Sequence, residues 1–316
     1  MSNAPATSST ELNIGVPFSF EVYPPRNPDL RDALNKTILE LAATGPDFIS
    51  VTYGAGGSSR DATLDCVKFI LANTDVEPMA HLTCVAESYQ GANELVRTFL
   101  DAGVRSFLAL RGDPPEGTQE GENFLGDLGS AAELTQLIHR VQAEREPFVF
   151  EEEPRWHAGA TRLSQKREFV RIGVAAFPNG HPQSRSKTQD IDVLLAKEAA
   201  GANLAITQLF FHADDYLSFA QKAKEAGLTM PIIPGIMPVI SPGRLRRMIE
   251  ISGEEMPSDL EIALEIEPTT EGQREIGVEH AASLARELIA GGAPGIHLYA
   301  FNQSGPVLDV LKRLEV

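Results

Sequence analysis

Short apolar runs of strand length recur along the whole chain, and each is closed by glycine, proline or a polar residue. Segments with helical spacing lie between them, for example residues 30–43, 92–102 and 216–226. The eight runs cover residues 18–25, 47–54, 78–85, 106–113, 171–178, 204–211, 231–239 and 295–302. Strands that alternate with helices pair in parallel, and 316 residues suit a closed barrel of about 250 residues plus insertions. We therefore predict an α/β protein with a single (β/α)8 TIM barrel.

Two intervals between the runs are longer than one helix requires. Residues 114–168 follow the fourth run and residues 250–273 follow the seventh, and neither has enough apolar residues to close its own core. We predict both as insertions, the second with an extra helix. An open, doubly wound sheet is the alternative, but no GxGxxG follows the first run. Residues 1–14 are predicted to form a disordered tail, residues 15–316 the barrel, and residues 307–314 a helix outside it.

Charge and cysteine content limit the partners. The chain has 44 acidic and 27 basic residues, a net charge of -17, which repels nucleic acid and anionic membranes. No apolar run is long enough to span a bilayer, and the N-terminus lacks the order of a signal peptide. The two cysteines form no CxxC and no metal-ligand cluster, so no metal site is expected. These features favour a reducing, cytoplasmic setting.

Polar residues lie at or just past the carboxyl ends of several predicted strands. They are Glu21, Thr52, His81, Asp113, His181 and Gln208. Singly, each is more often a satisfied core or edge group than a functional one. Because a buried polar group costs about 1–3 kcal/mol unless it is paired, six of them at one mouth favour a binding or catalytic site there.

Two of these residues have the environment of acid–base groups. Glu21 lies between aromatic residues, and an apolar environment would favour its protonated form, as a general acid requires. The run FLALRGDPP predicts a strand that stops at Asp113, and the charge of Arg111 would keep the Asp113 carboxylate ionised. The structural alternatives are a glutamate bridging two strands and an Arg–Asp pair capping a strand. The glycine-rich residues 53–63 could cradle a phosphate or a flat ring, or be an ordinary flexible loop.

The chain resembles the methylenetetrahydrofolate reductases, flavin-dependent barrels that make 5-methyltetrahydrofolate. The matching segments are FSFEVYPPR, FISVTYGAGGSSRDAT, AHLTCV, LALRGDPP, VAAFPNGHPQS, GANLAITQLFF, PIIPGIMPV and GAPGIHLYAFN. They occur in the order of the family and cover nearly the whole chain from Phe18 to Asn302.

The resemblance implies a role for individual residues. Glu21 would protonate N10 of the methylene substrate and open its five-membered ring to an N5 iminium ion. Asp113 would hold the pterin and stabilise the developing cation, and Gln208, Tyr299 and Gln303 would line the folate pocket. Gln303 replaces an arginine that many members use near the folate. The positions that would bind FAD are Thr52, Tyr53, Ala55, His81, Arg111, Gly112, Asp113, Ser130, Ala131, Phe177, His181, Ser184, Asp190 and Lys197.

The resemblance also implies the reactants. NADH or NADPH would reduce the flavin and depart, and folate would then take its place in a ping-pong scheme. A homo-oligomer is compatible with the family. Two departures keep a flavin-free reductase open, since Ser130 stands where the family has an aromatic residue and Phe177 where it often has tyrosine. A non-catalytic folate-binding barrel is the third possibility, although binding alone does not need both Glu21 and Asp113.

Overall fold

The computed structural model describes residues 12–25, 27–53, 60–85, 87–114, 117–118, 124–145, 150–151, 162–163, 169–186 and 188–315. The sheet strands are β1 (Phe18–Val22), β2 (Phe48–Val51), β3 (Glu77–Thr83), β4 (Ser106–Leu110), β7 (Arg171–Ala176), β8 (Leu204–Thr207), β9 (Ile232–Ile233), β10 (Gly235–Ile236) and β11 (Ile296–Tyr299). A separate antiparallel pair consists of β5 (Phe150–Glu151) and β6 (Arg162–Leu163).

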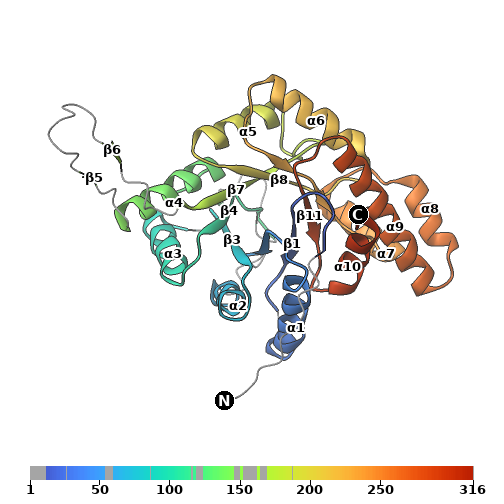
Figure 1. Cartoon of the computed structure of the whole chain (residues 1–316). Helices are drawn as coiled ribbons and strands as arrows, with labels where there is room; N and C mark the ends of the chain where they lie inside the picture. Colours follow the sequence, from blue (N-terminus) through green and yellow to red (C-terminus); the bar gives the residue numbers. More distant parts are fainter. Residues whose placement is uncertain are drawn as a thin grey trace, which may run out of the picture.

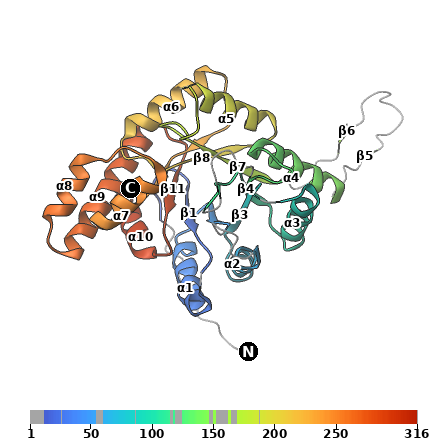
Figure 2. The same ribbon diagram turned by 180° about the vertical axis from the view of Figure 1, so that it is seen from behind.

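Ten α-helices are described. They are α1 (Arg31–Ala42), α2 (Arg60–Asn73), α3 (Tyr89–Asp101), α4 (Ala131–Arg145), α5 (Gln189–Ala199), α6 (Ala213–Glu225), α7 (Pro242–Ser252), α8 (Ser258–Ile266), α9 (Thr270–Ala290) and α10 (Ser304–Leu314), with a 3-10 turn η1 (Pro28–Leu30) before α1. The helices surround the strands in Figure 1 and, from behind, in Figure 2. None of these helices combines the length and apolarity needed to span a membrane.

The main sheet closes into a barrel at a proline. Its nine strands have the order β10-β11-β1-β2-β3-β4-β7-β8-β9, and all neighbours are parallel. Only Pro234 separates β9, which pairs with β8, from β10, which pairs with β11. One chain segment therefore serves both neighbours and closes the ring. This confirms the predicted TIM barrel, with its seventh strand split in two.

Alternation along the strands separates two apolar cores. Phe20, Ile49 and Phe107 belong to the large cluster that includes the surrounding helices. The alternate positions Phe48, Met79 and Leu108 form a second, smaller cluster with Leu204 and Ile206. This second cluster fills the barrel interior, because successive side chains of a strand point to opposite faces.

A polar layer closes the amino-terminal end of the barrel interior. Arg171 Nη1 lies 2.8 Å from Asp47 Oδ2 and 3.7 Å from Glu77 Oε2, and Ser106 Oγ donates to Glu77 Oε1 at 2.7 Å. The guanidinium of Arg171 also lies 5.7 Å from the Phe48 ring centroid. The charged groups at this end are thus paired with one another, which leaves the carboxyl ends of the strands as the open rim.

Several predicted boundaries differ from the structure. Residues 114–168 are not one insertion, because they contain α4, the helix that packs between α3 and α5. The extra helix in residues 250–273 is α8, which lies between the end of α7 and the start of α9. β4 ends at Leu110 rather than Asp113, and Gly112 then turns the chain with a φ of 86°. Residues 1–11 of the predicted tail lie outside the described residues, whereas Ile14 is buried in the core.

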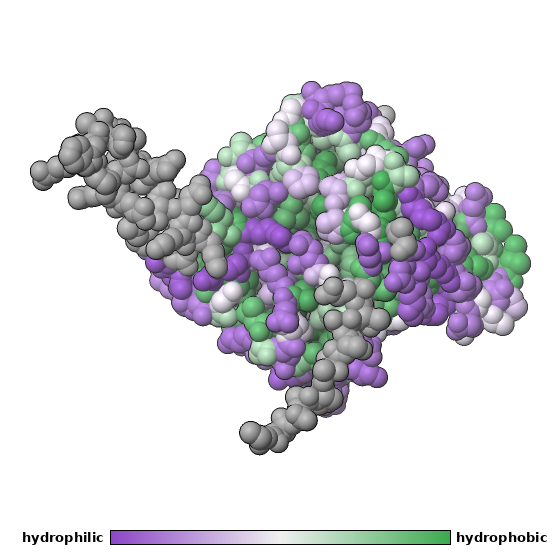
Figure 3. All heavy atoms as spheres, in the orientation of Figure 1, coloured by the Kyte–Doolittle hydropathy of each residue, from purple (hydrophilic) through white to green (hydrophobic). Residues whose placement is uncertain are grey.

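Apolar side chains reach the surface at one edge of the molecule. Ile262 and Ile266 of α8 are 54% and 75% exposed. The space-filling view shows a green, hydrophobic area at this edge (Figure 3). The extra helix thus leaves part of its apolar face in solvent.

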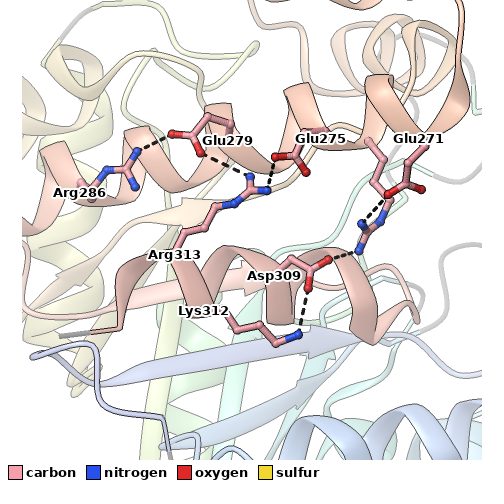
Figure 4. A network of polar contacts seen from close by, with 8 residues as sticks. Glu271, Glu275, Glu279, Arg286, Asp309, Lys312 and Arg313 are labelled. Atoms are coloured by element: carbon pink, nitrogen blue, oxygen red, sulfur yellow. Dashed lines mark hydrogen bonds and ion pairs between the residues drawn. The ribbon is translucent and has the colours of Figure 1, made fainter.

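Ion pairs attach the last helix to the barrel's outer layer (Figure 4). Arg313 of α10 lies 2.5 Å from Glu275 and 3.4 Å from Glu279 of α9, and Arg274 of α9 pairs with Asp309 of α10. The side chain of Arg313 is only 24% exposed, so water screens its charge less than it screens a surface pair.

We expect Arg313→Ala to lower the free energy of unfolding by roughly 1–3 kcal/mol, because it removes the cation that pairs with Glu275 and one of the two cations that pair with Glu279, which keeps Arg286. Urea denaturation would measure this loss. Arg247→Ala is the control, since Arg247 and its partner Glu250 are 62% and 68% exposed and such pairs contribute about 0–1 kcal/mol. Equal losses in the two variants would contradict the importance of the α9–α10 pairs.

Candidate functional site

Glu21 lies between two buried histidines at the upper end of β1. Its Oε2 atom is 3.6 Å from His81 Nε2 and 3.8 Å from His297 Nε2. The register brings this about, because Glu21 pairs with Tyr299 of β11 on one side and with Ser50 of β2 on the other. His81 lies on β3, the strand next to β2. Four consecutive strands thus supply one polar layer inside the barrel.

Three buried atoms of this layer have no hydrogen-bond partner among the described residues. They are Ser50 Oγ, His81 Nε2 and His297 Nε2. Because an unsatisfied buried polar atom costs about 1–3 kcal/mol, such a group of atoms around one carboxyl is typical of a functional site. Burial lowers the pKa of His81 to about 4, against the opposing charge of Glu21. His81 is therefore neutral at pH 7, and its contact with Glu21 is not an ion pair.

A hydrogen bond with Ser19 and contacts with two aromatic rings orient the imidazole of His297. Its Nδ1 atom lies 2.7 Å from Ser19 Oγ, and both side chains are buried. The ring stacks on Phe48 at 5.7 Å, and the Tyr299 ring meets it edge-on at 5.3 Å. These contacts fix the ring so that Nε2 faces Glu21. The sequence analysis did not single out Ser19 or His297, although each is a polar residue at alternate spacing from a predicted site residue.

The predicted folate residues Tyr299, Gln208 and Gln303 lie at or past the carboxyl ends of β11 and β8. Tyr299 donates its hydroxyl to Thr207 O at 2.7 Å, and burial together with the charge of Glu21 raises its pKa well above the usual value. Gln208, directly after β8, accepts the backbone N–H of Leu209 through Oε1 and keeps its amide nitrogen for other partners. Gln303 is exposed where α10 begins. The three therefore line the rim of β8, β11 and α10.

Asp113 and Arg111 lie at the opposite side of the rim, but they form no ion pair among the described residues. Arg111 Nη1 donates to Gln183 Oε1 at 2.9 Å, and its guanidinium lies 5.8 Å from the Phe124 ring centroid. The structural alternative of an Arg–Asp pair capping the strand is therefore wrong. Asp113 is exposed and three residues past the end of β4. Like Glu21, it is at the carboxyl end of its strand.

Most predicted cofactor residues gather in one region beside β4 and β7. Asp190 Oδ1 accepts hydrogen bonds from the His181 backbone N–H at 3.2 Å and from Ser184 Oγ at 2.8 Å. Lys197 Nζ donates to Ala175 O at 2.8 Å. Burial lowers the pKa of Lys197 to about 8, and burial together with Arg111 lowers that of His181. The region therefore combines a lysine, an arginine, a neutral imidazole and a carboxylate.

The remaining predicted cofactor residues differ in what they contact. The Phe177 ring meets the His181 ring edge-on at 4.7 Å. Ser130 Oγ accepts the Glu133 N–H at the start of α4, where Ala131 is buried. A Cβ atom on Gly112 would lie 2.4 Å from Val85 Cγ2, so only glycine fits there. Thr52 and Tyr53 follow β2 directly, and Ala55 lies outside the described residues.

The donor set suits an organic cofactor better than a metal ion. Within the described part of the chain, no three histidine, cysteine or carboxylate side chains are placed to hold a metal. The unsatisfied imidazole nitrogens and the nearby cations can instead bind polar and anionic groups of a flat, phosphorylated molecule.

Comparison with known proteins identifies the family. The family model described as methylenetetrahydrofolate reductase matches residues 9–315. The 5,10-methylenetetrahydrofolate reductase of Salmonella typhimurium is 30% identical over 298 residues, which cover 94% of this chain and 90% of that protein. The probable methylenetetrahydrofolate reductase (NADH) of Oryza sativa subsp. japonica is 30% identical over 307 residues. The match covers 94% of this chain and 48% of the plant protein, so the chain spans about half the length of such relatives.

A solved structure shares the fold. An uncharacterized protein from Clostridium thermocellum, which binds two copies of 5-methyl-5,6,7,8-tetrahydrofolic acid, superposes with a TM-score of 0.60 at 13% identity. The alignment covers 97% of this chain and 95% of that protein. The fold agrees with the result from the sequence relatives. This chain belongs to the methylenetetrahydrofolate reductase family.

Proposed function

We propose that the protein reduces 5,10-methylenetetrahydrofolate to 5-methyltetrahydrofolate with electrons from NADH or NADPH. The observation that carries this proposal is the Glu21 carboxyl group between the two unsatisfied imidazole nitrogens, one layer below the rim. A proton donor at this depth suits ring opening of a folate. The names of the bacterial and plant relatives and the folate bound by the Clostridium thermocellum protein support the choice of substrate.

In this proposal, Glu21 delivers the proton to N10 of the substrate and thereby opens the five-membered ring. His81 is neutral at working pH, so it can donate or accept a hydrogen bond beside Glu21 without adding a charge. His297 is held by Ser19 and limits the positions that the Glu21 side chain can take. The two imidazoles thus keep the acid pointed toward the rim.

Asp113 and the folate-pocket residues orient the substrate. The Asp113 carboxylate at the rim would stabilise the positive charge that develops on the opened ring, because oppositely charged groups attract. The amide nitrogen of Gln208, which has no hydrogen-bond partner among the described residues, can donate to the pterin carbonyl. Tyr299 is fixed by its bond to Thr207 and forms a rigid wall next to Glu21.

The region beside β4 and β7 is proposed to hold FAD. When bound, FAD supplies the hydride acceptor and donor that links the two substrates. Arg111 and Lys197 suit its anionic and electron-rich parts, and Asp190 suits ribose hydroxyls. His81 Nε2, which has no protein partner among the described residues, can bond to a ring heteroatom. A ping-pong order, a homo-oligomer and a cytoplasmic location stay predictions.

A flavin-free reductase is the second candidate, and the position of Ser130 favours it. This side chain is short and caps α4, so the protein has no aromatic ring there to stack on a flavin. An absorbance spectrum of the purified protein separates the two candidates, because only the first gives a yellow protein with flavin bands.

Glu21→Gln is expected to abolish folate reduction and to leave electron transfer from NAD(P)H to flavin or menadione intact, because only the folate step needs the proton. Stopped-flow absorbance would follow each half-reaction. Glu77→Gln is a matched control, since Glu77 lies at the far end of the barrel, bonded to Ser106. Equal loss of both half-reactions in Glu21→Gln would refute the role of Glu21.

FAD binding is expected to weaken as pH rises from 7 to 9, because Lys197 loses its proton as pH passes about 8. Equilibrium titration of the apoprotein with FAD at both pH values measures the change. Lys197→Met is expected to bind FAD more weakly at pH 7 and to lose most of this pH dependence. Lys222→Met, on α6, is the control that keeps it. The same pH dependence in Lys197→Met and wild type would exclude Lys197 as a cofactor residue.

A further inference from the structure

Arg244 lies at the start of α7, beside the chain segment that follows β11. It is in the first turn of α7, where its backbone N–H bonds to the capping residue Ser241 at 3.2 Å. Its guanidinium lies 5.5 Å from the centroid of the ring of Phe301, which lies two residues past the end of β11. An arginine on an aromatic face keeps its N–H groups at the ring's edges free to bind an anion.

The charge of Arg244 has no carboxylate partner among the described residues. On the same helix, Arg246 pairs with Glu265 at 2.8 Å and Arg247 pairs with Glu250 at 2.6 Å. The chain carries 44 acidic residues against 27 basic ones, so carboxylates are abundant. A half-buried arginine that pairs with no carboxylate of the described residues is therefore available to a negatively charged ligand.

The ring beneath Arg244 is held in place by an unusual turn. Phe301 and Asn302 both have left-handed backbone conformations, with φ of 48° and 56°. Such conformations cost about 1–2 kcal/mol per residue unless other contacts hold them. Asn302 provides these contacts, since its side chain accepts the Tyr23 N–H at 2.9 Å and donates to Tyr23 O at 2.8 Å. The Tyr23 ring in turn meets the Phe301 ring edge-on at 6.4 Å.

These contacts place a cation and two aromatic rings side by side past the carboxyl ends of β1, the strand of Glu21, and β11. Tyr23 lies two residues after Glu21, directly past the end of β1, and the residue is 39% exposed. Gln303, two residues after Phe301, contributes no charge. The rim therefore offers aromatic surface close to the proton donor and one positive charge beyond it.

We propose that Arg244, on its Phe301 support, binds the carboxylate tail of the folate substrate. This inference rests on the proposed function. A folate consists of a pterin, a benzoyl ring and a glutamate, in that order. With the pterin at Glu21, the aromatic surface of Tyr23 and Phe301 suits the benzoyl ring, and Arg244 suits a glutamate carboxylate. Phosphate of the nicotinamide nucleotide is the other oxyanion that could use this charge.

Steady-state kinetics of Arg244→Ala test the proposal. We expect KM for 5,10-methylenetetrahydrofolate to rise roughly 10- to 100-fold with kcat nearly unchanged, as for loss of one charge-assisted hydrogen-bonded contact. KM for NAD(P)H with menadione as acceptor should not change. On 5,10-methylenetetrahydropteroate, which lacks the glutamate, wild type and Arg244→Ala should have the same KM. Arg244→Lys keeps the charge without the planar stack and should fall between the two.

Arg247→Ala is the matched control on the same helix, and it should keep the wild-type KM for both folates. An unchanged KM for the full folate in a folded Arg244→Ala variant would overturn the proposal, as would an equal rise for the substrate without glutamate. A rise only in KM for NAD(P)H would assign the charge to the nucleotide instead. If wild type itself fails to reduce 5,10-methylenetetrahydrofolate, the proposed function fails first, and the role of Arg244 fails with it.

Discussion

Successive side chains of a strand point to opposite faces, and the rest of this structure depends on that constraint. Once the sheet closes, every second residue must enter the barrel, where it joins a layer with residues of the neighbouring strands. The amino-terminal layer is neutralised internally by Arg171 and its carboxylate partners. The middle layer is apolar around Met79 and Leu108. Among the described residues of the barrel interior, the next layer, with Glu21, is the one that leaves buried polar side-chain atoms without a hydrogen-bond partner, and it lies directly below the open rim.

Charged side chains on the outer helices differ in their partners from those at the rim. Most of the arginines on the outer helices of the described chain have carboxylate partners, as in the α9–α10 pairs. At the rim, Arg111 bonds to an amide, Lys197 to a carbonyl and Arg244 lies on an aromatic ring. In this strongly acidic protein, three cations at the rim thus have no carboxylate partner within 4 Å among the described residues, at the end where anionic reactants would enter. The field of the whole molecule repels anions, and these local charges oppose it.

The alternating runs were sufficient to predict the barrel and the end at which its polar residues meet, because periodicity and parallel pairing are local and general rules. The sequence analysis missed α4 although Ala131, Leu134, Ile138 and Val141 have helical spacing, since acidic and glycine-containing segments surround them. It also missed α7, which Ser241 and Pro242 begin in the usual way for a helix. His297 and Ser19, like Glu21, are polar residues inside an apolar strand, and their side chains also point into the barrel. The lack of a carboxylate partner for Arg244 among the described residues could not be predicted, because it depends on which side chains lie near it in three dimensions.

The ring is completed by segments from the two ends of the described chain. Ser19 and His297 are neighbours in space but 278 positions apart in sequence. During synthesis on the ribosome, β1 has an exposed edge until residues 296–299 emerge, and such an edge can pair with another nascent chain. Ribosomal stalling before that point would therefore yield a polypeptide prone to aggregation, in which Glu21 still lacks one of its two imidazole neighbours.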